Sequence, residues 1–372
     1  MRTIILLWGL LVSALMLPMV CAADRGETET IRVAVCEGVE NIRIDGIGLE
    51  ATNLFGSRLE LYFPLVVKRD GSGLSAGGMR LRSLRVISPG IVRVNGKGYR
   101  GTLEVYPSDR GILVVDEIIL EEYLVGLINC EISSQWPMEA VKAQAVVART
   151  FALFQKQARK DLLYHLESSV YDQVYGGSDI EDSRAARAVE ETRGEVVTYK
   201  GKIIQAFFHS SCGGHTEASE NVWSVSMPYL RGVECTYCMK TPSVLWEQTL
   251  SPKKLASKLR NAGYNVTTLA DIRIQSRYPS GRIEYLQLVT SDRIITMPAV
   301  TFRKIVGYGV IRSTNFEVKL IDDAFVFIGV GYGHGVGLCQ WGAKQRAEEG
   351  FNYREILAYY YPGTRVVSYY TE

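Results

Sequence analysis

The first part of the chain consists of short segments in which apolar and polar residues alternate. In one of them Val92 and Val94 face one side while Arg93 faces the other. A period of two is typical of antiparallel strands with one buried face. Such runs, separated by glycine-containing turns, occupy residues 31–36, 41–46, 80–87 and 91–107. We therefore predict a small all-β region over residues 31–107.

The period becomes helical at residue 120. A stripe at i, i+4, i+7, i+8 and i+11 is formed by Leu120, Leu124, Leu127, Ile128 and Glu131. A carboxylate that ends an apolar, core-facing stripe is poorly solvated, which raises its pKa. General-acid catalysis requires a carboxylic acid that is still protonated near neutral pH. Glu131 is therefore the candidate catalytic residue, unless the helix ends by Cys130 and leaves Glu131 in a solvated loop.

A second helix is predicted to begin at Pro137, which suits a first helical turn because its missing N–H is not needed there. A narrow face of small residues predicts close packing against the helix that carries Glu131; its members are Val141, Ala145, Ala148 and Ala152. Basic residues recur at seven-residue spacing, at Lys142, Arg149 and Lys156. We expect this row to be a solvated face of the helix.

The remainder alternates between helical and strand patterns. A hairpin turns through Lys200–Gly201, and Ser251 and Pro252 suit the start of a helix over 251–264. Further helices are predicted over 180–193, from Gln340 and over 353–360. We predict an α+β fold: an N-terminal β region, a central helical core with Glu131, a β-rich accessory stretch, and a C-terminal glycine-rich loop with helices. The predicted divisions are 1–23, 31–107, 108–240 and 241–372.

The bulk properties fit an ordinary globular protein. The 372 residues are 47% hydrophobic and 22% charged, which allows a sizeable core and two or three domains. The formal net charge of +2, without a long basic patch, gives no indication of nucleic-acid binding.

The N-terminus reads as a targeting segment over residues 1–23. Arg2 is followed by an apolar run and then by the small residues Ala22 and Ala23, which is the layout of an export signal. The run is nearly long enough to remain as a membrane anchor. Val20 before Cys21 argues against a lipoprotein. We expect an exported protein of the cell envelope, membrane-attached only if this segment is not cleaved.

Two knuckles of metal-binding type follow the hairpin. Cys212 and His215 form a C-x-x-H pair, and Cys235 and Cys238 form a C-x-x-C pair. This spacing predicts a tetrahedral structural zinc site, since four protein ligands leave no position for water. A disulfide between Cys212 and Cys235 or Cys238 is the alternative, because an exported protein meets an oxidising compartment.

Two loops offer polar and aromatic groups. One, over 169–179, carries Tyr171, Gln173 and Tyr175, which could line a sugar groove or an ordinary turn. In the other, glycine recurs at every second position from 329 to 337 and presents His334 and Gln340. Such a backbone suits close approach by a ligand or a strand.

Three long segments carry a family resemblance. The run YLVGLINCEISSQWPMEAVKAQAVVARTF over 123–151 resembles the stage II sporulation protein D family, in which a glutamate precedes a proline and a helix of this type. Residues 171–217 and 331–364 agree with the same family. Residues before about Val114 carry little of it.

The resemblance implies a peptidoglycan lytic transglycosylase with Glu131 as acid/base, acting on glycan strands stripped of stem peptides. It implies that Tyr171, Gln173, Tyr175 and Ser211 belong to the glycan groove, which the His334–Gln340 loop closes. It also implies a partner amidase. Two other readings stay open: a non-catalytic amidase enhancer, and a zinc-stabilised module that binds the wall without cleaving it.

Overall fold

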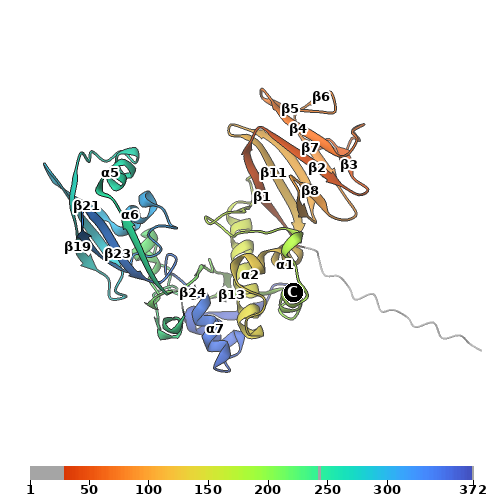
Figure 1. Ribbon diagram of the computed structural model, residues 1–372. Coiled ribbons are helices and arrows are strands. Elements are labelled where there is room, and N and C mark those ends of the chain that lie inside the picture. Colours follow the sequence, from red (N-terminus) through yellow and green to blue (C-terminus); the bar gives the residue numbers. More distant parts are fainter. Residues whose placement is uncertain (1–28, 242–243, 371–372) are drawn as a thin grey trace, which may run out of the picture.

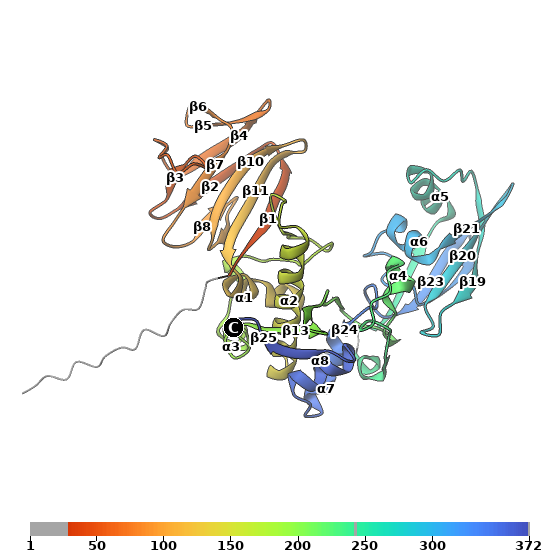
Figure 2. The ribbon, with the colours of Figure 1, turned by 180° about the vertical axis from the view of Figure 1, so that it is seen from behind.

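The computed structural model describes residues 29–241 and 244–370 (Figure 1). The predicted signal over 1–23 lies outside these residues. Within the described ranges, no helix is both long and apolar enough to cross a membrane. The fold is α+β, as predicted, with a β unit and an inserted α/β unit on opposite sides of a helical core (Figures 1 and 2).

The N-terminal unit packs two six-stranded sheets together. The first, in spatial order, contains β12 (Leu166–Glu167), β1 (Thr30–Val39), β11 (Gly111–Ile119), β10 (Thr102–Ser108), β7 (Leu84–Ile87) and β3 (Glu50–Thr52). The second contains β6 (Met79–Leu81), β5 (Gly73–Ala76), β4 (Leu65–Asp70), β2 (Asn41–Gly46), β8 (Val92–Val94) and β9 (Lys97–Tyr99). Side chains of both sheets, such as Val33 and Ile44, share one core. The predicted β region is confirmed, and it extends to Ile119.

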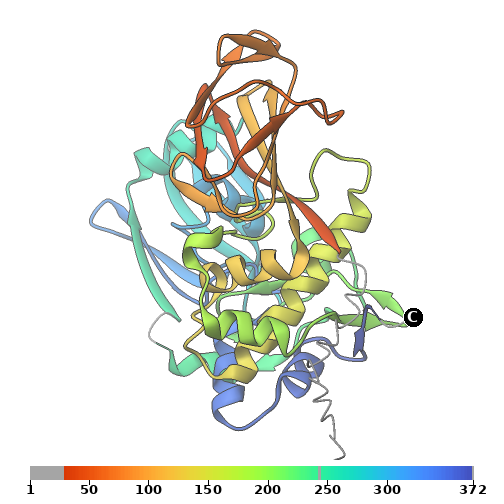
Figure 3. The ribbon, with the colours of Figure 1, turned by 90° about the vertical axis from the view of Figure 1, so that its right-hand side faces the viewer.

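The helical core begins where β11 runs directly into α1 (Leu120–Glu131). Next come α2 (Met138–Ala158), η1 (Ser178–Ile180) and α3 (Ser183–Glu190). The four apolar members of the predicted stripe are fully buried, and Glu131 is the last helical residue. The prediction that the helix reaches Glu131 is therefore confirmed. Figure 3 shows the helices beneath the β unit.

Arg149 corrects the prediction of a solvated basic row. Its side chain is fully buried and binds Glu121 through two hydrogen bonds, Nε to Oε1 at 2.9 Å and Nη2 to Oε2 at 2.7 Å. The guanidinium also donates to the carbonyl oxygens of Val189 and Glu195. The seven-residue spacing wrongly predicted exposure to solvent, because α3 and the strand after it cover this side of α2.

Replacing Arg149 by methionine is expected to destabilise the protein by about 3–5 kcal/mol, since it leaves the Glu121 carboxylate buried without its cation. Urea unfolding measures this change. The matched control is Arg187→Ala, which removes an exposed i,i+4 ion pair with Glu191 and should cost far less, because water and salt screen such a pair. Equal losses in the two variants would contradict this account of Arg149.

The C-terminal segment returns to the helical core. It contributes β24 (Leu338–Cys339), α7 (Gln340–Glu348), α8 (Tyr353–Tyr360) and β25 (Arg365–Ser368). Its strand partners are β15 (Phe208–His209), parallel to β24, and β13 (Glu195–Tyr199), which also pairs with β14 (Lys202–Ile203). Nearby are β16 (Gly214–His215), α4 (Ser219–Trp223), β17 (Glu234–Cys235) and η2 (Thr236–Lys240).

The inserted unit lies between these two parts of the core in sequence and has its own apolar core. One sheet contains β18 (Leu245–Leu250), β23 (Ala324–Val330) and β22 (Phe316–Ile321). The other contains β19 (Leu269–Arg277), β20 (Ile283–Thr290) and β21 (Ile294–Pro298), with α5 (Pro252–Asn261) and α6 (Ala299–Val306). The stretch 241–372, predicted as one division, thus supplies both this unit and part of the core.

Candidate active site

Glu131 ends α1 with its carboxyl group turned toward the loop that follows β12. Its Oε1 accepts a hydrogen bond from the Val174 N–H at 3.0 Å. Burial raises the pKa of Glu131 to about 7, although hydrogen bonds from Val174 and the Gln340 side chain act in the lowering direction. The residue as a whole is only partly buried. A carboxyl group with this pKa can both donate and accept a proton near neutral pH.

Two buried glutamine side chains complete the immediate surroundings, which corrects the expectation that Gln340 faces the substrate. Gln340 is the first residue of α7, and its Nε2 donates to Oε1 of Gln144 on α2 at 3.4 Å. The Nε2 of Gln144 is buried without a hydrogen-bond partner in the described part of the chain. Sequence reasoning missed Gln144. The sequence did offer an indication: Gln144 is a polar residue three positions after Val141, on the small-residue face of the helix.

His334 sits in an aromatic cluster on the glycine-rich loop. The Trp223 ring stacks on Phe207 with centroids 4.2 Å apart, and His334 lies 5.1 Å from Trp223. The His334 Nδ1 accepts the Val336 N–H at 3.1 Å. Burial holds the pKa of His334 well below its ordinary value, with neighbouring basic side chains adding to the effect, so the ring is neutral. Trp223, 38% exposed, offers an accessible aromatic face.

The predicted groove residues of the 169–179 loop separate into two groups. Tyr171 is 71% exposed, three residues before Val174. Gln173 and Tyr175 are buried instead: Gln173 Oε1 accepts from the Tyr123 hydroxyl at 3.2 Å, and the Tyr175 ring packs on Tyr123. This placement corrects the expectation that both line a groove. The loop turns them inward because Gly126 lets it approach α1 closely.

Ser211 also lies inside the protein. It is fully buried, and its backbone exchanges two hydrogen bonds with Tyr332, at 3.0 and 2.8 Å. Its position therefore supports the glycine-rich loop and corrects the expectation of a side chain that faces the substrate.

Four cysteines converge beneath this loop. The Sγ atoms of Cys212, Cys235, Cys238 and Cys339 all lie within 4.8 Å of one another, and all four residues are buried. His215 is outside the cluster, with its Nδ1 2.5 Å from the Thr216 carbonyl oxygen. The structure thus places Cys339, and not His215, beside the other three predicted ligands. The parallel pairing of β15 with β24 places Cys339 beside Cys212.

The geometry of the cluster fits a tetrahedral metal better than a disulfide. A zinc–sulfur bond of about 2.3 Å requires sulfur atoms about 3.8 Å apart, whereas a disulfide bond is about 2.05 Å long. The Sγ atoms of Cys212 and Cys238 are 3.3 Å apart, and all four cysteines are free. Backbone N–H groups of Cys212 and Gly342 point at the Cys339 sulfur, at 3.3 and 3.4 Å, so this sulfur is a hydrogen-bond acceptor.

A buried arginine from the inserted unit lies against the cluster. Arg282 donates from Nη2 to the Cys212 carbonyl oxygen at 2.9 Å, and its guanidinium fills the space where Gly335 has no side chain. Four thiolates and one divalent ion would carry a net negative charge, so a buried cation here is electrostatically favourable. Arg282 also ties the inserted unit to the His334 loop.

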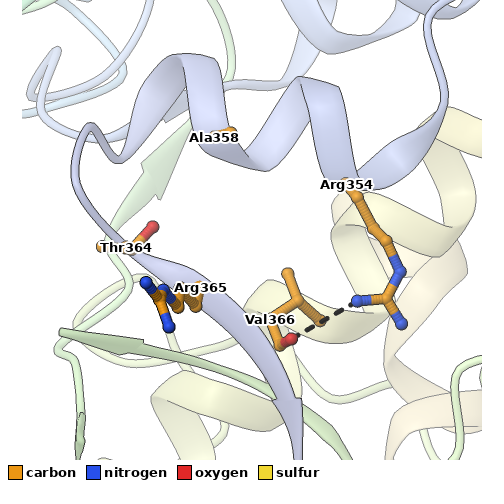
Figure 4. A pocket seen from close by; sticks show the side chains of 5 residues that line it. All are labelled: Arg354, Ala358, Thr364, Arg365 and Val366. Atoms are coloured by element: carbon orange, nitrogen blue, oxygen red, sulfur yellow. Dashed lines mark hydrogen bonds between the residues drawn. The ribbon is translucent and has the colours of Figure 1, made fainter. Parts of the chain in front are cut away.

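Two pockets of the surface lie away from Glu131. One, of about 330 Å³, lies between α8 and β25 and is shown in Figure 4; its lining residues are Arg354, Ala358, Thr364, Arg365 and Val366. Arg354 is already engaged there, with the Val366 carbonyl oxygen at 3.3 Å and the Glu195 carboxylate. Another, of about 580 Å³, is formed by loops of the β unit around Pro89. Neither includes Glu131 or its partners.

Comparison with known proteins places the chain in a family. A model described as stage II sporulation protein matches residues 108–199. The stage II sporulation protein D of Bacillus amyloliquefaciens is 31% identical over 267 residues, which cover 68% of this chain and 75% of that protein. The chain belongs to the stage II sporulation protein D family. The matched range of this family member contains α1, α2 and Glu131.

Two further proteins are similar to the chain described here. An uncharacterized protein of Brachyspira hyodysenteriae is 36% identical over 301 residues, or 78% of this chain and 80% of that protein. The amidase enhancer of Bacillus subtilis is 34% identical over 297 residues, or 66% of this chain but 40% of that protein. A model described as a domain of unknown function matches residues 239–337, which contain the inserted unit.

Proposed function

We propose that this protein is a peptidoglycan lytic transglycosylase with Glu131 as its only acid/base. The observation that carries the proposal is the Glu131 carboxyl group: its pKa is about 7, and the groups that shift it include no other carboxylate. Hydrolytic glycosidases use two carboxylates that flank the scissile bond. A lytic transglycosylase needs one, because an internal hydroxyl of the substrate replaces water.

The proposed reaction uses the same carboxyl group twice. Protonated Glu131 gives its proton to the oxygen between MurNAc and GlcNAc as the bond to C1 breaks. The resulting carboxylate then removes the proton of the MurNAc C6 hydroxyl, whose oxygen bonds to C1 and forms a 1,6-anhydro end. Hydrogen bonds from the Val174 N–H and Gln340 would stabilise the carboxylate between these steps.

The neighbouring side chains support a sugar ligand. Trp223 exposes a ring that Phe207 holds from behind, and aromatic faces pack against the apolar faces of sugar rings. His334, which lies 5.1 Å from Trp223 and is partly exposed, adds a polar ring at the same place. We propose Trp223 and His334 as glycan contacts, with Tyr171 at the edge of the site, while the buried Gln340 and Gln144 support the Glu131 carboxyl group from behind.

We propose further that Cys212, Cys235, Cys238 and Cys339 hold a structural zinc ion. A closed set of four cysteines leaves no position for water, so the ion would not take part in glycan cleavage. Cys339 directly precedes Gln340, so the ion would fix the residue that contacts Glu131.

The alternative function is that of an amidase enhancer, which is the name of the B. subtilis relative. Under our proposal the protein is exported to the cell envelope and works after an amidase has removed stem peptides. The two functions differ in their dependence on that amidase.

The test uses the purified protein, lacking the predicted signal, on intact and on peptide-free peptidoglycan. Our proposal predicts soluble glycan fragments from peptide-free strands with no amidase present. An enhancer would release nothing alone and would accelerate stem-peptide release when a cell-wall amidase is added. That second pattern would replace the transglycosylase proposal.

A further inference from the structure

Two tyrosines from distant parts of the chain meet next to the Glu131 site. Tyr171, on the loop after β12, and Tyr308, just after α6 of the inserted unit, pack edge to face with centroids 6.5 Å apart. Tyr171 is nevertheless 71% exposed, and Tyr308 is partly exposed. Exposed aromatic side chains that gather in one place mark surfaces that bind a ligand or a partner.

The loop holds Tyr171 in a fixed place. The next residue, Asp172, binds Arg159 through two hydrogen bonds, at 2.6 and 3.0 Å, and accepts the Glu167 N–H at 2.9 Å. The Tyr171 N–H donates to the Ser169 hydroxyl at 3.2 Å. An exposed ring on an anchored loop loses little conformational freedom when a ligand binds, which favours affinity.

Tyr308 is equally well supported. The Arg303 guanidinium lies over its ring, 4.7 Å from the centroid. Arg303 also donates to the carbonyl oxygens of Ile311 and Arg312, at 2.9 and 3.0 Å. These bonds fix the turn that presents Tyr308, so the pair is preorganised on both sides.

The pair is connected to Glu131 through one loop and to the His334 loop through another. Tyr171 is three residues from Val174, whose N–H binds Glu131, so the two Cα atoms are at most about 11 Å apart. On the other side, the Arg312 carbonyl oxygen accepts the Gly333 N–H at 2.9 Å, next to His334. A polymeric ligand that binds at Glu131 and follows the loop after β12 would come within reach of the tyrosines.

We propose that Tyr171 and Tyr308 form an additional sugar-binding subsite for a glycan strand that extends beyond the scissile bond. The inference rests on the proposed function and gives the inserted unit a role in substrate recognition. Two phenol rings offer apolar faces to a pyranose and hydroxyl groups to its polar substituents. The subsite should matter for long strands and not for short ones.

Binding of labelled peptide-free strands, short and long, tests this in a Glu131→Gln background, where cleavage does not interfere. Tyr308→Ala should raise the Kd for long strands roughly three- to tenfold, the loss expected for one aromatic contact, and leave short strands unaffected. Tyr308→Phe should bind nearly as the parent does. The matched control is Tyr285→Ala, which removes a tyrosine that is 37% exposed on β20 of the same unit.

Unchanged binding of long strands by Tyr308→Ala, with an intact fold by circular dichroism, overturns the inference. So does weaker binding of an added amidase with glycan binding unchanged, which would make the pair a protein-docking surface. The catalytic proposal fails separately: a parent protein that binds long strands through Tyr308 but never cleaves them keeps this subsite and loses the acid/base role of Glu131.

Discussion

Replacing Glu131 by glutamine is expected to lower the rate of glycan cleavage at least about 100-fold, with the fold intact. The amide keeps the shape of the side chain but cannot transfer a proton, and positioned acid–base groups contribute about 10²–10⁴-fold. The rate of fragment release from peptide-free strands measures the change. The control is Glu122→Gln, which alters an exposed carboxylate on the same helix and should leave the rate unchanged. Equal rates in all three proteins would exclude Glu131 as the acid.

The same substitution has a signature in pH dependence. The parent should lose activity as the pH rises through about 7, because the acid must start protonated.

The stability of the protein should also depend on the protonation of Glu131. Its folded-state pKa of about 7 lies above its unperturbed 4.5, so the folded state binds more protons between these values. The parent therefore loses stability as pH rises over this window. Glu131→Gln should gain relative stability there, by at most about 3 kcal/mol above pH 7. A difference that does not vary with pH would contradict the raised pKa.

The cysteine cluster should produce the largest effect on stability. Cys339→Ser, or removal of metal by a strong chelator, is expected to lower the free energy of unfolding by at least about 4 kcal/mol, since a tightly bound ion stabilises the folded state by mass action. Metal content by elemental analysis and thermal unfolding measure the two consequences.

Two matched variants make this test specific. His215→Ala should retain the metal, because His215 lies outside the cluster. Cys36→Ser should also retain it, since Cys36 is a free cysteine elsewhere. Metal loss in His215→Ala with retention in Cys339→Ser would restore the ligand set suggested by spacing and contradict the structural one.

Local periodicity predicted most of the elements. The alternating runs became strands, and the stripe that ends at Glu131 became α1 with its apolar members buried. These features depend on which faces of an element are apolar, which the sequence records directly. The raised pKa of Glu131 followed from the same pattern, because a carboxyl group at the end of a buried stripe is desolvated in any fold that buries the stripe.

The sequence did not predict the features that depend on contacts between distant parts of the chain. Cys339 is about a hundred residues from Cys238, and the parallel pairing of β15 with β24, together with packing of α7 on η2, brings it to the cluster. Arg149 is buried because other elements cover its side of α2, which the helical spacing could not show. Tyr175 points inward because a glycine contact lets its loop approach α1. In each case the deciding partner lies far away in sequence.

The most direct test of the central claim is the chemistry of the new glycan ends. Mass spectrometry of products from peptide-free strands, made by the parent and by Glu131→Gln, distinguishes them. Our account predicts 1,6-anhydro-MurNAc ends from the parent and none from the variant. Reducing ends from the parent would mean that water attacks C1, and would contradict an intramolecular reaction run by Glu131 alone.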